Sequence, residues 1–171
     1  VVFAQQPVIR IEDAFGNLRS SDSGTVVSVT RSTGTGTLQG TVARAAVNGV
    51  VTFTNLSYNL AETITLSFSS SGLAGAASSN VAVGAAAASR LTIQTQPSST
   101  ATAGASFAQQ PVIRVEDQFG NLRTSDNSTV VTAARSAGSG TLQGTTSATA
   151  ANGLVTFANL AHNVATNITI A

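Results

Sequence analysis

An internal repeat constrains this chain more strongly than any other feature of its sequence. Residues 3–10 recur unchanged as residues 107–114, and the offset of 104 residues then holds without a gap to residue 171. Between residues 3–67 and 107–171, 41 of the 65 residue pairs are identical. A period of this length is that of a whole domain and not of a short solenoid unit. The sequence therefore predicts a tandem array of similar domains.

The repeat also predicts where one domain ends and the next begins. We expect a first domain over residues 1–88 and a second over residues 89–171, joined by a stretch of small residues. In this division the first domain lacks the counterpart of residues 91–106, its opening strand. The second lacks the counterpart of residues 68–83, its closing strand. Each domain is therefore expected to be one strand short within these 171 residues.

Short runs that alternate apolar and polar residues predict an all-β fold. Residues 63–68, for example, alternate Ile64, Leu66 and Phe68 with Thr and Ser. Such alternation, with β-branched residues and frequent turns, is typical of a β-sandwich, and no helical spacing is sustained. The pairs Asn48-Gly49 and Asn152-Gly153 favour type I′ hairpin turns. The expected strand segments are 25–29, 51–54, 63–68, 81–83, 91–95 and 112–117.

The composition excludes several classes of function. Charged residues make up 9% of the chain and the net charge is +1, so there is no basic patch for nucleic acid. Without Cys there can be no disulfide, no thiolate metal site and no cysteine nucleophile. No apolar run approaches the roughly 20 residues of a membrane span. A chain rich in Ser, Thr, Ala, Gly and Val with so few charges is typical of secreted or cell-surface β-rich repeats.

Two sequence elements carry a resemblance to a known family. One is Ile/Val-Glu-Asp-x-Phe-Gly-Asn, at residues 11–17 and 115–121, and the other is Asn-Gly-x-Val-Thr-Phe, at residues 48–53 and 152–157. With the order of the segments around them, they resemble the bacterial Ig-like repeats of large secreted and surface proteins. The kinship is to invasin- and intimin-type domains and, more loosely, to filamin-type repeats.

The resemblance implies tandem Ig-like β-sandwiches in a stalk, adhesin or matrix protein, and no enzymatic activity. Those repeats often carry Gly-Thr-Tyr in the penultimate strand. Residues 61–64 and 165–168 differ from that pattern, so the tyrosine corner of the family is not expected here. Fold analogy alone does not establish function.

Three acidic residues of the first copy recur in register in the second, and the resulting six are candidate calcium ligands near a domain junction. Carboxylate oxygens are preferred ligands of Ca²⁺, and an ion there would stiffen an array. The alternative is local: Asp13 and Asp117 cap the turns that follow them, and Glu12 pairs with Arg10. No other cofactor is expected. The candidate ligands are Glu12, Asp13, Asp22, Glu116, Asp117 and Asp126.

The sequence contains no set of residues suited to catalysis. His162, the single histidine, aligns with Tyr58 and is expected to be an exposed loop residue without a triad or metal partner. Glu62 aligns with Thr166, so the copies do not share the carboxylate pair that a glycosidase needs. We therefore expect a protein that is not an enzyme.

A sandwich that lacks its first or last strand exposes a groove and unpaired backbone groups, which can accept a strand from a neighbour. The expected partners are accordingly adjacent repeats or copies of this chain, together with a host or matrix surface. The alternative is that the 171 residues are a window on a longer covalent array. The strand-exchange candidates are Leu91, Ile93, Phe68, Val81 and Val83.

These inferences combine into one expected function and one alternative. We expect a non-enzymatic structural repeat of an extracellular stalk or filament, completed by strands from neighbouring repeats or subunits. The alternative is an adhesive or glycan-binding Ig-like module that uses the loops at residues 32–36 and 136–140. Those loops contain no Trp or Tyr on which a sugar could stack.

Overall fold

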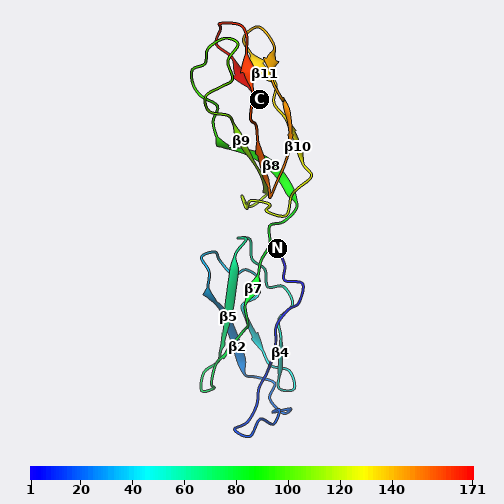
Figure 1. Cartoon of the computed structure of the whole chain (residues 1–171). Helices are drawn as coiled ribbons and strands as arrows, with labels where there is room; N and C mark the ends of the chain where they lie inside the picture. Colours follow the sequence, from blue (N-terminus) through cyan, green and yellow to red (C-terminus); the bar gives the residue numbers. More distant parts are fainter. The chain divides into compact units, whose positions relative to one another are not determined.

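The computed structural model describes residues 1–171 and divides them into two compact units, Val1–Gly84 and Ala85–Ala171 (Figure 1). The fold is all-β, without a helix, and its strands pair in antiparallel sheets. The predicted fold class is confirmed at this level, and the sheets are consistent with a β-sandwich. The two units divide between Gly84 and Ala85, four residues before the expected boundary, and the first strand of unit 2 begins at Ala88.

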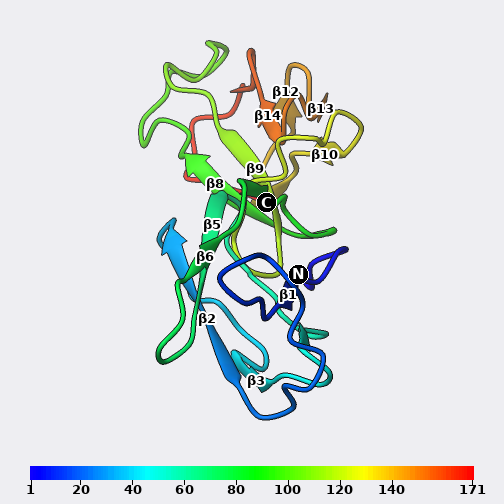
Figure 2. The same ribbon diagram turned by 90° about the horizontal axis from the view of Figure 1, so that it is seen from below.

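Unit 1 contains two antiparallel sheets. In the larger one the strand order is β3-β2-β5-β6 (Figure 2), with β7 also paired to β5. In the smaller one β1 pairs with β4. The strands are β1 (Val8–Arg10), β2 (Val26–Thr33), β3 (Ala43–Ala45), β4 (Val50–Thr52), β5 (Thr63–Ser69), β6 (Ala76–Ala77) and β7 (Val81–Ala82).

The core of unit 1 follows from the alternation in its strands. On β5 the residues Ile64, Leu66 and Phe68 are buried, while the Thr and Ser between them are more exposed. They form one cluster with Val51 from the smaller sheet and with Phe53, which follows it. Alternate residues of a strand point to opposite faces, so both sheets place their apolar faces on this cluster.

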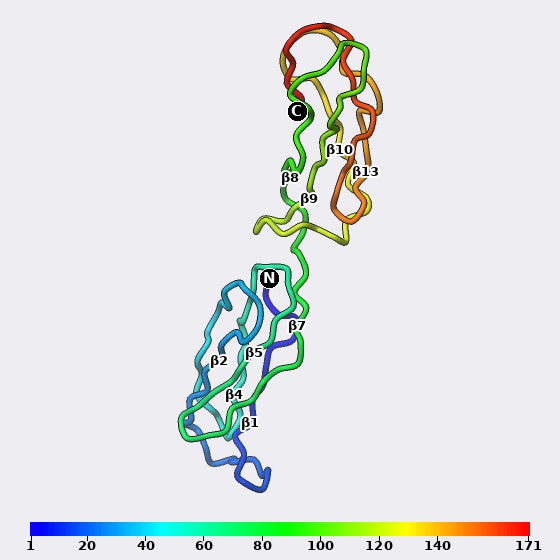
Figure 3. The backbone as a smooth tube through the Cα atoms, turned by 60° about the vertical axis from the view of Figure 1, so that its left-hand side comes forward, coloured from blue at the N-terminus to red at the C-terminus, as the bar shows by residue number.

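Unit 2 is built from β8 to β16. The sheet order is β14-β9-β8, and three further antiparallel pairs are β10 with β13, β11 with β16 and β12 with β15. In Figure 3 β8 and β9 run side by side, as their register shows. The strands are β8 (Ala88–Thr95), β9 (Val112–Asp117), β10 (Val130–Thr132), β11 (Arg135–Ala137), β12 (Leu142–Gln143), β13 (Ser147–Thr149), β14 (Leu154–Thr156), β15 (Ala161–His162) and β16 (Thr169–Ile170).

Unit 2 has a separate hydrophobic core. Val115 and Val155 are fully buried at its centre, and Phe107, Phe157 and Leu160 pack around them. Each unit thus buries its own apolar side chains, as an independently stable domain must.

The Asn-Gly turns have the predicted backbone geometry. Asn48 and Gly49 have φ angles of 52° and 79°, and Asn152 and Gly153 have φ angles of 51° and 77°. Positive φ at both central residues is what a type I′ turn requires, and Asn and Gly tolerate it best. These turns connect residues on either side that pair as isolated bridges, such as Val47 with Val50.

Candidate functional site

Asp13 organises the turn that follows β1 in unit 1. Its Oδ1 accepts hydrogen bonds from the backbone N–H groups of Phe15 and Asn17, both at 2.9 Å. Its Oδ2 accepts a third from the side-chain amide of Asn17 at 3.0 Å. The side-chain amide of Asn17, followed by its backbone N–H, lowers the pKa of Asp13. The turn-capping role expected for Asp13 is therefore observed.

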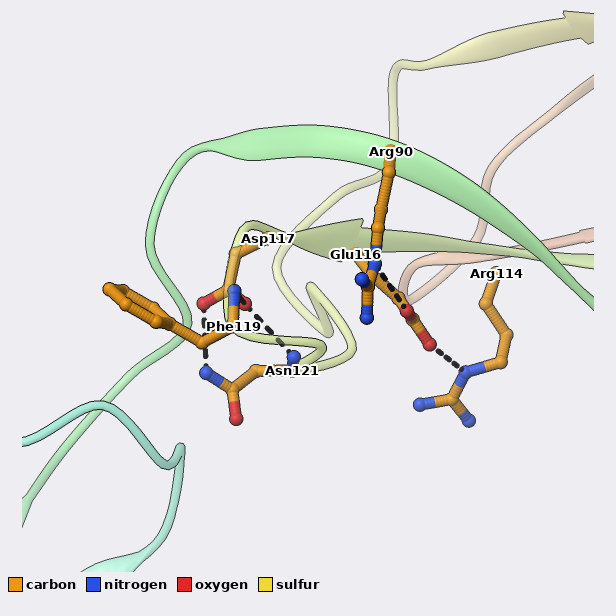
Figure 4. Close-up of polar contacts among 6 residues, drawn as sticks. All are labelled: Arg90, Arg114, Glu116, Asp117, Phe119 and Asn121. Carbon is orange, nitrogen blue, oxygen red and sulfur yellow. Dashed lines mark hydrogen bonds and ion pairs between the residues drawn. The ribbon is translucent and has the colours of Figure 1, made fainter. Parts of the chain in front are cut away.

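Asp117 forms the corresponding turn in unit 2, and here the carboxylate is fully buried. The backbone N–H groups of Phe119 and Asn121 bond to Oδ1 at 2.9 Å, and the Asn121 amide bonds to Oδ2 at 2.8 Å (Figure 4). Oδ2 also accepts a bond from the backbone N–H of Ala86 at 2.8 Å. Burial raises the pKa of Asp117, but the bonds from Asn121, Ala86 and Phe119 outweigh it and lower that pKa to about 2. The buried carboxylate is thus charged at neutral pH.

Glu116, the neighbour of Asp117, is held between two arginines. Arg114 Nε lies 2.7 Å from Oε1 and Arg90 Nε lies 3.1 Å from Oε2 (Figure 4). The hydrogen bond from Arg114 is the main cause that lowers the pKa of Glu116. In unit 1 only the pair of Arg10 with Glu12, at 3.1 Å, is present, and both side chains are exposed. An exposed pair of this kind adds little stability.

Together, Asp117 and Glu116 attach the opening segment of unit 2 to the rest of that unit. Asp117 binds the backbone at Ala86 and Glu116 binds the side chain of Arg90, so two carboxylates hold two points of one short segment. Arg90 also lies against the turn itself, because a Cβ added at Gly120 would come within 2.7 Å of its guanidinium. We call residues 86–90 with this acidic turn the entry clamp.

The remaining calcium candidates also bind their own turns. Asp22 accepts bonds from the backbone of Gly24 and from both the backbone and hydroxyl of Thr25. Asp126 makes the same contacts in unit 2, where Thr129 takes the place of Thr25. No three acidic or histidine side chains are grouped so that they could hold one ion. The calcium hypothesis gains no support from this arrangement, in which the carboxylates serve as turn caps.

Glu62 has a role that the sequence did not indicate. Its Oε1 accepts bonds from the backbone N–H groups of Thr35 at 2.7 Å and Gly36 at 3.0 Å, and from the hydroxyl of Tyr58. The hydrogen bond from Tyr58, followed by those from the loop backbone, lowers the pKa of Glu62 to about 2. Glu62 therefore closes the loop at residues 32–36. The sequence offered one signal: Tyr58 and Glu62, four residues apart, are both replaced by other residues at the aligned positions of the second copy.

His162 does not occupy the exposed position that we expected. It lies in β15 with only 5% of its surface exposed, because it takes the place of the fully buried Tyr58. Its Nδ1 is 2.9 Å from the carbonyl oxygen of Val164. The loop at residues 136–140 is closed by Arg135, which donates to the carbonyl groups of Gly138 and Gly140. Arg31, the counterpart of Arg135, likewise donates to the carbonyl of Gly34 in unit 1. The two copies thus share the arginine that closes this loop, and unit 1 adds Glu62 to it.

The five strand-exchange candidates separate into two sets. Phe68 is buried in the unit 1 core, and Val81 and Val83 are half-buried against it. Leu91 and Ile93 share one face of β8, and each is 51% exposed although β8 is paired with β9. Both residues line a groove of about 820 Å³, which lies entirely within unit 2. We call it the unit 2 groove; its floor includes Ile113, Val131, Phe157 and Ile168.

Comparison with protein-family models, with curated proteins and with solved structures found no match to this chain. The structure contains no helix with the length and apolar character needed to cross a membrane.

Proposed function

We propose that this chain is a non-enzymatic structural segment of an extracellular stalk or filament, built from tandem Ig-like β-sandwiches that repeat every 104 residues. Its work is mechanical, namely to span distance between other parts of an assembly. The single observation that carries the proposal is that two units with separate cores use the same turns at positions 104 apart.

The turns that recur support a structural role and not a chemical one. Four carboxylates accept hydrogen bonds from nearby backbone N–H groups, namely those of Asp13, Asp22, Asp117 and Asp126. Such bonds stabilise loops and leave few acceptor positions for a substrate. By contrast, the side chains most suited to chemistry, His162 and Glu62, differ between the copies. The features that the two copies share are thus ones that maintain the shape of the loops.

The entry clamp supports the mechanical part of the proposal. A chain that transmits force needs the segment that enters each domain to be attached firmly to it. Charge-assisted hydrogen bonds are stronger than neutral ones, and the buried residues Asp117 and Glu116 make such bonds to Ala86 and Arg90. The clamp therefore attaches the entering segment to unit 2 at a point where tension would act.

Single-molecule force spectroscopy on the whole chain, held at its two ends, tests the proposal. We expect two separate unfolding events, each releasing about 30 nm of chain, because each unit has about 85 residues of up to ~3.5 Å. Extension without resistance, or a single event for both units, would contradict the proposal. A glycan array provides the second test, since saturable binding of a sugar would favour the adhesive alternative. Electron microscopy of native material then distinguishes a filament from a stalk.

A further inference from the structure

The unit 2 groove occupies a position that, in unit 1, is filled by core side chains. Residues 3–67 align with residues 107–171, so the 104-residue offset gives residues 68–83 no counterpart within unit 2. In unit 1 this segment, which we call the closing segment, includes β6, β7 and the end of β5. It contributes Phe68, Val81 and Val83 to the apolar cluster. Unit 1 is therefore an internal template for what the groove can hold.

The contact between Phe68 and Phe53 is the clearest part of that template. The two rings lie with centroids 5.9 Å apart and an interplanar angle of 49°, a favourable tilted arrangement. Phe157 is the counterpart of Phe53, and it lines the unit 2 groove. Phe157 is 3% exposed, so its ring lies in the wall of the groove, at the position where Phe53 meets Phe68 in unit 1.

The residues beneath the closing segment differ in exposure between the units. Ile64 and Leu66 are fully buried in unit 1, where Val81 pairs with Ile64. Their counterparts Ile168 and Ile170 are only half-buried, and both line the groove. Covering these side chains would remove apolar surface from water, which is the main driving force for association.

The backbone around the groove is suited to a strand. In unit 1, β5 pairs with β2 along one edge and with β6 and β7 along the other. In unit 2, β16 pairs with β11, the counterpart of the end of β2, and no strand pairs with its other edge. An extended segment can add to such an edge through main-chain hydrogen bonds while alternate side chains enter the groove.

The chemistry of the groove matches the chemistry of the closing segment. No Asp, Glu, Lys or Arg side chain lines the groove, and residues 68–83 contain none. Buried polar atoms of lining residues, among them Ser98 Oγ and His162 Nε2, have no hydrogen-bond partner within the chain. The five Ser residues and Asn80 of the closing segment are groups that can satisfy such atoms. The occupant that fits is therefore uncharged, extended and rich in small residues.

We propose that the unit 2 groove binds a β-strand segment of the closing-segment type, with a Phe packed on Phe157 and a Val-x-Val pair over Ile168. This inference rests on the proposed function, because it gives the contact by which one repeat is completed by a polypeptide segment. A second copy of this chain is a poor donor. Its own closing segment is held in unit 1, where Phe68 is 4% exposed and β5 pairs with β6 and β7.

The test is a titration of the whole chain with a synthetic peptide of residues 68–83, followed by isoleucine-methyl NMR. Four isoleucines, Ile93, Ile113, Ile168 and Ile170, line the groove, and the other three, Ile9, Ile11 and Ile64, lie in unit 1. We expect saturable shifts of the groove methyls and none of the unit 1 methyls. A peptide with Phe68→Ser and Val81→Ser is the matched control, and it should bind at least about tenfold more weakly.

A variant chain extends the test. Residues 68–83 fused directly after Ala171 keep the 104-residue spacing, since Ser67 aligns with Ala171. We expect this extended chain to show the shifted methyl signals without added peptide and to bind peptide at least about tenfold more weakly. The NMR signals of His162, the single histidine, report that unit 2 is folded in both chains.

Three outcomes would overturn the proposal. The first is no shift of the groove methyls at about 1 mM peptide. A dissociation constant of that size corresponds to a binding free energy of about −4 kcal/mol. The second is shifts that grow with the concentration of the chain alone, which would make a second copy the occupant. The third is binding of an apolar dye that the peptide does not displace. If the chain binds the peptide but lacks two unfolding events, only the proposed function fails, and the reverse result refutes only the groove proposal.

Discussion

The hydroxyl of Tyr58 donates a hydrogen bond to Oε1 of Glu62, four residues further along the chain. The same oxygen accepts hydrogen bonds from the backbone N–H groups of Thr35 and Gly36. One carboxylate therefore joins two segments that are far apart in the sequence. In unit 2 the two positions hold His162 and Thr166, so this carboxylate has no counterpart there. The loop bond from Arg31 in unit 1 and from Arg135 in unit 2 is common to both copies. The loops at this end of each unit are therefore closed by side chains and are not free.

Replacement of Glu62 should loosen unit 1 without effect on unit 2. We expect Glu62→Gln to lower the unfolding midpoint of unit 1 by about 5 °C, because the charge that strengthens three hydrogen bonds is lost. Tyr58 is the only tyrosine and there is no tryptophan, so intrinsic fluorescence reports unit 1 alone. Thr166→Ala, at the aligned position in unit 2, is the control and should leave the fluorescence transition unchanged. An unchanged midpoint for Glu62→Gln would show that the loop does not depend on this carboxylate.

The same residue gives unit 1 a specific response to acid. The pKa of Glu62 is lowered to about 2 from an ordinary value of 4.5, so the unfolded state binds a proton more readily than the folded state. Its contribution to stability is complete above pH 4.5 and is lost as the pH falls toward 2. Tyr58 fluorescence during urea unfolding at several pH values measures this. The Glu62→Gln variant should show a weaker pH dependence in that range, and equal slopes for both chains would refute the assignment.

Asp13 and Asp117 cap equivalent turns, but the first carboxylate is exposed and the second is buried, so the effect of burial can be measured by substitution. Asp117→Ala should destabilise unit 2 by about 3 kcal/mol, since it leaves the buried backbone and side-chain amides of Asn121, and the part-buried N–H groups of Phe119 and Ala86, without their acceptor. Asp13→Ala removes the same local bonds where water can replace them, so a much smaller loss is expected. The NMR signals of His162 follow unit 2 and Tyr58 fluorescence follows unit 1 during denaturation. Equal losses from the two substitutions would contradict the role assigned to burial.

Two glycines are required by close backbone approach. A Cβ at Gly40 would lie 2.3 Å from the carbonyl oxygen of Asn55, and one at Gly144 would lie 2.1 Å from that of Asn159. Both residues also have positive φ. We expect Gly40→Ala to destabilise unit 1 by about 2 kcal/mol or more. Gly24→Ala is the control: nothing lies within 4 Å of its Cβ and its φ is not positive, so a gain of up to about 1 kcal/mol is expected. Thermal unfolding followed by Tyr58 fluorescence compares the two.

Features that depend on neighbours in the sequence were predicted well. The Asn48-Gly49 turn needs only two adjacent residues that tolerate positive φ, and the cap at Asp13 needs only an Asn four residues later. The strand at residues 63–68 follows from alternation within one segment, and β5 extends it by one residue. Such patterns act over a few residues, so they can be read without knowledge of the fold.

Features that depend on distant residues were missed or wrongly predicted. His162 was expected in an exposed loop, but the neighbours that bury it come from other strands. The sequence offered no reason to bring Glu62 to residues 35 and 36, and the pairing of Arg90 with Glu116 needs β8 to lie beside β9. These contacts join segments about 25 residues apart, and local pattern does not indicate which segments meet.

The sequence by itself determined that this chain is all-β, where its tight turns fall and that its two parts are copies of one another, because alternation, turn chemistry and identity are local properties. Only the tertiary structure decided which copied residues are buried. Asp117 is fully covered where Asp13 is exposed, and Ile168 is half-buried where Ile64 is enclosed. The reason is physical: burial depends on what packs above a side chain, and identical residues differ when the segment that covers them is present in one unit and absent from the other.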